Sequence, residues 1–282
     1  MRIKKKKSCL IPAYIITLLL VILFILCGCT KTKEEVEIQV FIAASLKKPM
    51  EEIAKLYNSS HPDVTITYNV DSSGKLMTQI EEGYSCDIYF SAAKKQMDRL
   101  EKDGFVIENT RRNVLNNQLV LITCKDSLTK VTGLSNIKNA SSIALAGGFV
   151  PAGRYTRQAL VNMGVLSDEG DVAEISTREI SEILGGVEIS EQDNVSKVLT
   201  AVVEESCEVG TVYLSDTYGF EDEVRILEIV PNDLTGDVIY PIARIENTNA
   251  SASQNHAADD FLNYILSDEA GDIFEKYYFD IT

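Results

Sequence analysis

The regular alternation of strand-like and helix-like segments between residues 36 and 102 constrains the fold of this chain more than any other feature. Runs of β-branched and aromatic residues alternate there with amphipathic stretches whose apolar residues recur at helical spacing. The expected elements are, in order, a strand at 36–43, a helix at 46–57, a strand at 64–70, a helix at 74–82, a strand at 87–91 and a helix at 94–102. This order is typical of a parallel sheet covered by helices, because parallel strands need crossover connections.

The rest of the chain continues the pattern and predicts a second lobe. The further expected elements are strands at 118–123, 142–146, 210–214 and 238–245, helices at 151–163, 195–203, 257–266 and 269–277, and a polar loop at 249–255. A crossing near Asn116 and a return near Tyr240 predict an α/β fold with two lobes, each a mainly parallel sheet flanked by helices, joined by a hinge. Lobe 1 would comprise residues 36–116 and 240–282, and lobe 2 residues 117–239.

The first 28 residues have the order of a bacterial signal peptide. Basic residues within positions 2–7 precede an almost continuous apolar run at 10–26. The motif Leu26-Cys27-Gly28-Cys29 resembles a lipobox, which implies cleavage before Cys29 and diacylglycerol on its sulfur. Residues 29–35 would form a polar tether, and two acyl chains suffice for stable membrane attachment. The alternative is an uncleaved anchor helix, because the apolar run is long for a signal peptide.

The body of the chain is strongly acidic. Removing the first 28 residues removes five basic residues and no acidic one, so the net charge changes from −15 to −20. This charge argues against nucleic acid as a partner. A bound anion would have to be held by local dipoles, which is feasible because salt screens the distant charges beyond about 8 Å.

The cysteines and histidines give no sign of a metal centre. Cys86, Cys124 and Cys207 lie in the body of the chain without a CxxC spacing. They are interpreted as buried small hydrophobic residues, and one disulfide with one free thiol is the alternative. His61 and His256 have no partner at ligand spacing, which argues against a zinc site and a histidine-based catalytic triad.

Four segments place small residues where a helix is expected to begin. A helix N-terminus presents free backbone N–H groups and a partial positive charge, so it attracts anions. None of these segments carries a cationic motif, which predicts a pocket that holds an anion by hydrogen bonds alone. The four segments are Ala43-Ala44-Ser45-Leu46, Asp71-Ser72-Ser73-Gly74-Lys75, Val150-Pro151-Ala152-Gly153 and Asp193-Asn194-Val195-Ser196.

Seven short motifs carry a resemblance to a known family. In order they are Ala43-Ala44-Ser45-Leu46, Ser73-Gly74 with Gln79-Ile80, Cys86-Asp87-Ile88-Tyr89-Phe90-Ser91-Ala92, Asn117-Gln118-Leu119-Val120-Leu121, Val150-Pro151-Ala152-Gly153-Arg154-Tyr155, Asn194-Val195 and Gly210-Thr211-Val212-Tyr213. Over roughly residues 36–282 the chain resembles the molybdate-binding proteins of ABC transporters. The resemblance implies a type II periplasmic-binding-protein-like fold. The segment at 175–192 departs from the family pattern by its length.

The resemblance also implies an oxyanion site shared by both lobes. Ser45 would supply a hydroxyl, and Ser73 a hydroxyl and an N–H, from lobe 1. Ala152 and Val195 would supply backbone N–H groups, and Tyr213 its phenol, from lobe 2. Molybdenum would bind as its oxyanion and not as a bare cation, and no cofactor is implied. The alternatives are that both serines are ordinary helix N-caps and that the tyrosine is a core residue.

The chemistry of these residues favours an anion without a proton. Molybdate, tungstate and sulfate need donors only, whereas phosphate keeps a proton near neutral pH and is usually held with a carboxylate acceptor. None of the five candidate residues is a carboxylate. Asp71 lies near Ser73 in sequence and is expected to cap the helix or face solvent. Asp87 is expected to be a structural carboxylate, and Lys94 part of a solvated helix face.

These observations together predict a lipid-anchored solute-binding protein on the extracytoplasmic face of the cell membrane. It would capture molybdate or tungstate as a monomer and deliver the anion to the permease of an ABC transporter. It is not expected to be an enzyme. One alternative is a binding protein for another anion, such as sulfate. A hydrolase of anionic esters is a further alternative, although no nucleophile and base are seen together.

Overall fold

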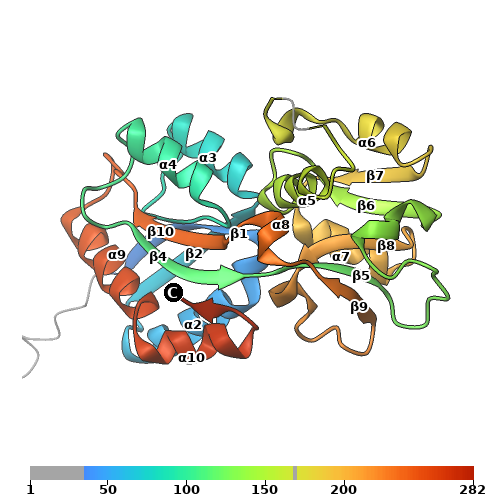
Figure 1. Cartoon of the computed structure of the whole chain (residues 1–282). Coiled ribbons are helices and arrows are strands. Elements are labelled where there is room, and N and C mark those ends of the chain that lie inside the picture. The colour runs from blue at the N-terminus through green and yellow to red at the C-terminus, as the bar shows by residue number, and fades with distance from the viewer. Residues whose placement is uncertain (1–34, 168–169) are drawn as a thin grey trace, which may run out of the picture. The chain divides into compact units, whose positions relative to one another are not determined.

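The computed structural model describes residues 35–167 and 170–282. The expected signal peptide, Cys29 and nearly all of the tether therefore lie outside the described residues. Val36–Thr282 form one compact unit that contains two sheets (Figure 1). No helix in the described part of the chain is long and apolar enough to span a membrane.

Lobe 1 is built on a six-stranded mixed sheet with the strand order β11-β4-β10-β3-β1-β2. Strands β1, β2 and β3 are parallel, and β10 runs antiparallel to both β3 and β4. The strands are β1 (Val36–Ala43), β2 (Val64–Asp71), β3 (Ile88–Phe90), β4 (Arg112–Asn117), β10 (Val238–Arg244) and β11 (Asp280–Ile281). The helices are α2 (Lys47–Ser60), α3 (Ser73–Glu81), α4 (Lys94–Lys102), α9 (Ala252–Ile265) and α10 (Asp268–Lys276).

Helices cover both faces of this sheet (Figure 1). Successive strand residues point to opposite faces, so the apolar strand β1 serves two cores. Phe41 packs with Leu76 of α3 and Met97 of α4. Val40 and its neighbours at alternate positions belong to the larger core, which contains Ile53 of α2. The continuous apolar run at the end of β1 follows from this burial on both faces.

Lobe 2 contains a five-stranded mixed sheet with the order β7-β6-β8-β5-β9. Strands β7, β6 and β8 are parallel, and β5 is antiparallel to β8 and β9. The strands are β5 (Leu119–Cys124), β6 (Ser142–Ala146), β7 (Glu188–Gln192), β8 (Val209–Tyr213) and β9 (Val224–Ile229). The helices are α5 (Pro151–Asn162), α6 (Thr177–Ile183), α7 (Val195–Val203) and α8 (Asn232–Thr235), with 3₁₀ turns at Leu134–Asn139, Val172–Glu174 and Leu214–Thr217.

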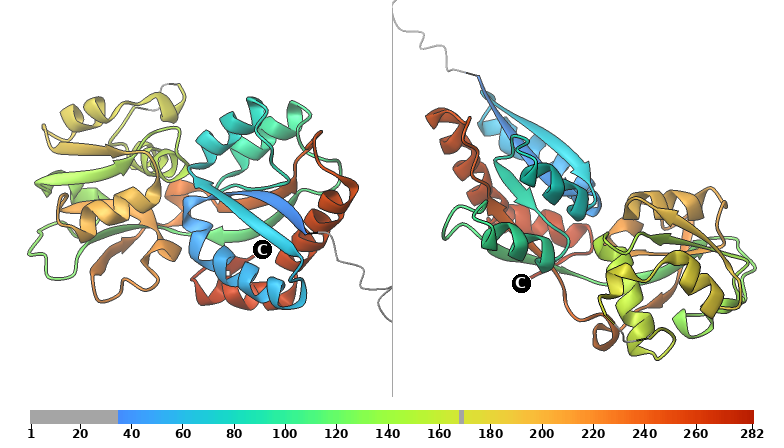
Figure 2. Two further views of the ribbon diagram at one scale, coloured as in Figure 1. Left: turned by 180° about the vertical axis from the view of Figure 1, so that it is seen from behind. Right: turned by 90° about the horizontal axis from the view of Figure 1, so that it is seen from above.

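Two segments connect the lobes (Figure 2). Only Gln118 separates β4 in the first sheet from β5 in the second. The chain returns after β9 through residues 230–237, which include α8, and enters β10. The expected two-lobe α/β architecture is confirmed. Each sheet combines a parallel part with antiparallel strands at and beyond these connections.

Several elements were not expected from the sequence. Strands β4, β7, β9 and β11 and the short helix α8 are additional. Strand β7 is an edge strand with polar residues, and its pattern therefore lacks the apolar run of a central strand. The expected loop at 249–255 is partly wrong, because α9 already begins at Ala252. The hydroxyl of Ser251 accepts a hydrogen bond from Gln254 N at 3.1 Å and caps the helix there.

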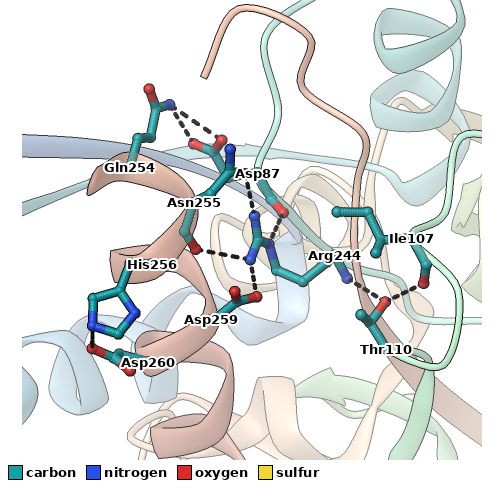
Figure 3. Close-up of polar contacts among 9 residues, drawn as sticks. All are labelled: Asp87, Ile107, Thr110, Arg244, Gln254, Asn255, His256, Asp259 and Asp260. Carbon is teal, nitrogen blue, oxygen red and sulfur yellow. Dashed lines mark hydrogen bonds and ion pairs between the residues drawn. The ribbon is translucent and has the colours of Figure 1, made fainter. Parts of the chain in front are cut away.

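A buried polar network fixes α9 to the sheet of lobe 1 (Figure 3). The carboxylate of Asp87, which is fully buried, accepts hydrogen bonds from Gln39 N at 2.7 Å and Gln254 Nε2 at 2.9 Å. The buried Arg244 donates from Nε to the main-chain oxygen of Asp87 at 2.9 Å and pairs with Asp259 on α9. Asp87 is therefore a structural carboxylate, as expected.

The cysteines of the described residues are all free thiols. Cys86 and Cys207 are buried, and burial raises the pKa of both thiols. Cys124 is only partly buried, which differs from the expectation of three buried residues. The disulfide alternative is not seen. Among the described residues no cluster of three histidine, cysteine or acidic side chains is arranged to hold a metal ion.

Candidate functional site

A small cavity between the lobes is lined by all five candidate site residues. Its volume is about 10 Å³, which is the room of about one water molecule. This space is too small for a sugar, a nucleotide or a peptide, and the lining groups must also move apart before a tetrahedral oxyanion can enter. No charged side chain and no histidine or cysteine lines the cavity. The lining residues are Ala43, Ala44, Ser45, Ser72, Ser73, Ala92, Val150, Pro151, Ala152, Asn194, Val195 and Tyr213.

Ser73 is the first residue of α3 and is fully buried. Its Oγ accepts a hydrogen bond from Ala92 N at 2.9 Å, so the hydroxyl proton remains for another acceptor. The N-cap of this helix is Ser72, which makes no side-chain cap. The alternative that Ser73 is an ordinary N-cap is therefore wrong, and its side chain lies at the wall of the cavity.

Ser45 lies in a 3₁₀ turn, Ala44–Leu46, that follows β1 directly. The residue is 7% exposed, and its Oγ lies 3.0 Å from Tyr240 Oη. It is not the N-cap of this turn, a position that Ala43 occupies. Tyr240 was not singled out from the sequence, where it reads only as part of an apolar strand. A register shift in β10 between Tyr240 and Pro241 accompanies this contact.

Backbone groups form the wall that lobe 2 contributes. Ala152 is the second residue of α5, after Pro151 at the favoured first position, and Val195 is the first residue of α7. The side chain of Asn194 caps α7 by accepting from Lys197 N at 3.0 Å. First-turn N–H groups have no intrahelical acceptor, so those of Ala152 and Val195 are available to a bound anion.

Glycine packing sets the position of α5. A Cβ on Gly153 would lie 2.2 Å from the main-chain oxygens of both Ala146 and Gly147, at the end of β6. A Cβ on Gly148 would lie 2.0 Å from Ala173 O. Only glycine allows the helix start to approach the strand end this closely. The donor at Ala152 therefore depends on neighbouring residues that have no side chain.

Tyr213 ends β8 and is 1% exposed. Its ring packs edge-on against Tyr155 and Tyr240, as in a core cluster. Its hydroxyl has no hydrogen-bond partner among the described residues. Burial, with a contribution from the neighbouring Tyr240, raises its pKa, so the phenol stays protonated. A buried hydroxyl without a partner is costly, which indicates that a ligand or water completes it.

Charged residues lie in a second, larger cavity next to the first. This cavity has a volume of about 760 Å³. Two of the cationic groups at its wall pair across the lobes, with Lys95 Nζ 2.6 Å from an Asp171 oxygen and Lys75 Nζ 3.6 Å from one of Asp193. Asp171 also pairs with Arg154, and these contacts hold the pKa of the Asp171 carboxyl well below its usual range. The cations therefore neutralise carboxylates.

The lobes also approach each other closely beside these cavities. A Cβ on Gly74 of α3 would lie 3.0 Å from the main-chain oxygen of Phe149 in lobe 2. Asp71 points away from the small cavity, since its carboxylate accepts from Ser72 N at 2.7 Å and lies 3.9 Å from Lys75 Nζ. Asp71 does not cap α3, which has no side-chain cap, and its carboxylate is partly exposed beside Lys75. Lys94 is exposed at the start of α4, as expected.

Known proteins resemble this chain over nearly its whole length. The YvgL protein of Bacillus subtilis, named as a substrate-binding lipoprotein of an ABC transporter, is 29% identical over 89% of this chain and 88% of its own. The molybdate-binding protein ModA of Escherichia coli is 28% identical over 88% of this chain and 90% of its own.

One solved structure is also similar to this chain in both sequence and fold. The substrate-binding domain of a molybdenum ABC transporter from Clostridium difficile superposes with a TM-score of 0.61 and 28% identity, covering 88% of this chain and 99% of that domain. The expected resemblance to molybdate-binding proteins and the type II fold are thus confirmed. The family model for bacterial extracellular solute-binding proteins matches residues 38–280. The chain therefore belongs to the family of bacterial extracellular solute-binding proteins.

Proposed function

We propose that this protein captures molybdate or tungstate outside the membrane and delivers the anion to an ABC transporter. The observation that carries the proposal is one small cavity lined by hydroxyl and backbone donors from both lobes, without a carboxylate or a cation. The similarity to ModA of Escherichia coli supports the same ligand class. We propose lobe boundaries near residues 116/117 and 239/240, which lie one residue before the end of β4 and two residues after the start of β10.

The proposed ligands of the oxyanion are six donors on five residues, because Ser73 would offer its N–H group as well as its hydroxyl. Ser45 and Ser73 donate hydroxyl protons from lobe 1, and Tyr213 donates its phenol proton from lobe 2. Ala152 and Val195 donate backbone N–H groups. Each hydrogen bond to a charged group contributes about 1.5–3 kcal/mol. Five or six such bonds, less the cost of desolvating a dianion, correspond to micromolar binding or tighter.

The protein is proposed to act by binding and not by catalysis. The described residues that line the cavity include no histidine, cysteine or carboxylate, so neither serine has a catalytic base beside it there. His61 stacks on Tyr57, and His256 pairs with Asp260 on the surface of α9. Turnover of phosphate or sulfate esters by the purified protein would contradict this part of the proposal.

Calorimetry of the purified protein tests the ligand. Molybdate, tungstate, sulfate and phosphate are titrated separately under one buffer condition. We expect molybdate and tungstate to bind far more tightly than phosphate, because the residues that line the cavity include no carboxylate to accept the phosphate proton. Preferred binding of sulfate would identify the protein as a sulfate carrier. Phosphate binding equal to that of molybdate would overturn the assignment.

We propose further that the protein is a monomer attached to the membrane through acylated Cys29. The lipobox-like motif supports this attachment. The variant Cys29→Ala removes the thiol that would be acylated, and it should release the protein from membranes or block signal cleavage. Fractionation and gel mobility check this. Unchanged processing and membrane association in the variant would rule out the lipid anchor.

A further inference from the structure

We propose that Asn117 and Tyr240 fix the direction of the hydrogen bond at Ser45 and thereby set the selectivity of the site for unprotonated oxyanions. The inference rests on the proposed function. Neither residue lines the small cavity. They act through a chain of hydrogen bonds that runs from Asn117 through Tyr240 to Ser45. Asn117 lies at the end of β4, where the chain crosses between the lobes, and Tyr240 lies near the start of β10, after the return.

The main chain fixes the orientation of the Asn117 amide. Its Oδ1 accepts a hydrogen bond from Gln118 N at 2.8 Å. The amide nitrogen must therefore be the atom that faces Ser215 Oγ at 2.8 Å and Tyr240 Oη at 3.3 Å. An amide nitrogen can only donate, so Asn117 donates to the oxygen of Tyr240. Asn117 is 1% exposed and has almost no contact with bulk water.

Among the described residues, Ser45 Oγ is the acceptor that lies within hydrogen-bond distance of the Tyr240 hydroxyl. The hydroxyl is fully buried and bonds Asn117 and Ser45. If Ser45 donated to Tyr240, the phenol proton would face only the donor nitrogen of Asn117 and would have no acceptor. Tyr240 therefore donates to Ser45 Oγ across 3.0 Å. Burial raises the pKa of Tyr240, so the proton is present at every ordinary pH.

Both serines at the cavity are thus left in the same state. Ser45 accepts from Tyr240, and Ser73 accepts from Ala92 N, so each has its own proton left for the cavity. Each serine oxygen has one of its two lone pairs occupied, and when its own proton points into the cavity the remaining lone pair points in a different direction. An anion that carries a proton, such as hydrogen phosphate, then has no serine acceptor for that proton. An unmet donor of this kind lowers affinity by about 10- to 100-fold.

The variant Tyr240→Phe tests the inference, because it removes the phenol oxygen and keeps the ring. Ser45 then loses its fixed donor, and its hydroxyl can turn to accept a proton. We expect molybdate affinity to fall by about 3- to 30-fold. We expect phosphate affinity to fall less or to rise, so that the ratio of the phosphate and molybdate dissociation constants shrinks about tenfold. Calorimetry with both anions, and with sulfate as a second unprotonated anion, measures the ratio.

The matched control is Tyr155→Phe. Tyr155 also packs on the ring of Tyr213, but its hydroxyl lies 3.5 Å from Asp237 O and outside the hydrogen-bond chain. The control should leave the ratio unchanged, and circular dichroism with thermal unfolding checks that both variants fold. If Tyr240→Phe weakens all three anions equally, or changes nothing beyond twofold, the inference is wrong while the proposed function stands. If the wild-type protein binds no oxyanion, both are wrong.

Discussion

The two lobes contribute different kinds of chemical group to the same cavity. Lobe 1 provides side-chain hydroxyls, and each of them is held by another protein donor, as in the contact of Ser73 with Ala92 N. Lobe 2 provides main-chain N–H groups at the starts of α5 and α7, together with one phenol. The donors of lobe 1 therefore depend on what the side chains are. The main-chain donors of lobe 2 depend on how closely the backbone packs.

This difference predicts opposite sensitivities to substitution. In lobe 1, truncation of a side chain removes a donor and leaves the backbone in place. In lobe 2, truncation of Ala152 or Val195 leaves the N–H group intact, whereas added bulk nearby displaces it. The glycines around α5 are the positions at which added bulk matters most.

The largest effect is expected for Gly153→Ala in lobe 2. The new Cβ would lie 2.2 Å from two carbonyl oxygens, so the start of α5 must move. We expect molybdate affinity to fall more than about 100-fold and the melting temperature to drop, because overpacking of this kind costs about 1–3 kcal/mol or more. Calorimetry and thermal unfolding measure both quantities. The control Gly271→Ala makes only ordinary contacts and should leave binding unchanged. Wild-type binding by Gly153→Ala would contradict the packing argument.

The next effect is expected for Ser73→Ala in lobe 1. The variant removes one hydroxyl donor, which corresponds to a loss of about 1.5–3 kcal/mol, or roughly 10- to 150-fold in the dissociation constant. Stability should fall as well, because Ala92 N loses its buried acceptor. The neighbouring Ser72→Ala should have a much smaller effect on titration with molybdate. A larger effect at Ser72 than at Ser73 would show that the motif is shifted by one position.

A loss of affinity similar to that of Ser73→Ala is expected for Tyr213→Phe, but with the opposite effect on stability. The phenol hydroxyl has no partner among the described residues, so its removal relieves a desolvation cost in the ligand-free protein. We expect weaker molybdate binding, by roughly 10- to 150-fold, and an unchanged or higher melting temperature without ligand. A lower melting temperature together with unchanged affinity would mean that this hydroxyl serves the fold and not the ligand.

A smaller effect is expected for Gly74→Ala, at the contact between the lobes. The added Cβ would lie 3.0 Å from Phe149 O of lobe 2, which hinders the close approach of the lobes. Alanine also favours a helix over glycine. We expect affinity to fall about fivefold, since the crowding costs about 1 kcal/mol, while stability stays the same or rises. Scattering profiles with and without molybdate would show incomplete closure, and closure equal to wild type would refute the steric account.

The smallest effect concerns pH and Asp216 of lobe 2. Its carboxylate accepts from Tyr213 N at 2.9 Å, and burial raises the pKa of Asp216 to about 7. Because the unfolded chain loses this proton near pH 4, the folded state holds it more tightly, and stability should fall as pH rises from about 4 to 7. Asp216→Asn keeps the acceptor and removes the proton equilibrium, so its melting temperature should decline less over this range. Identical pH profiles for both proteins would exclude this contribution.

The sequence predicts the proposed donors of lobe 1 better than those of lobe 2, because a side-chain donor is visible in a sequence and a backbone donor is not. Ser45 and Ser73 could be identified because a hydroxyl at an expected helix start is visible in the chain. The N–H groups of Ala152 and Val195 have no side-chain signal and were assigned only through the family resemblance. Gly153 carries the packing that positions α5, and its role is visible only once the oxygens of β6 are placed beside it.

The contacts between residues far apart in the sequence could not be predicted from local patterns. Tyr240 lies 195 positions from Ser45, and Asn117 is 123 positions from Tyr240. Their meeting depends on β4 and β10 being neighbours, and β4 was not expected because Arg112–Asn117 is largely polar. Short or polar strands such as this depend on tertiary pairing more than on intrinsic preference.

The measurement that tests the shared cavity most directly is a crystal structure of the purified protein grown with tungstate, with diffraction data collected at the tungsten absorption edge. We expect one strong anomalous peak in the small cavity. The oxyanion oxygens should accept hydrogen bonds from Ser45, Ser73 and Tyr213 and from the backbone N–H groups of Ala152 and Val195. A peak held by Lys95 or Arg154 in the larger cavity, or by one lobe alone, would contradict the account.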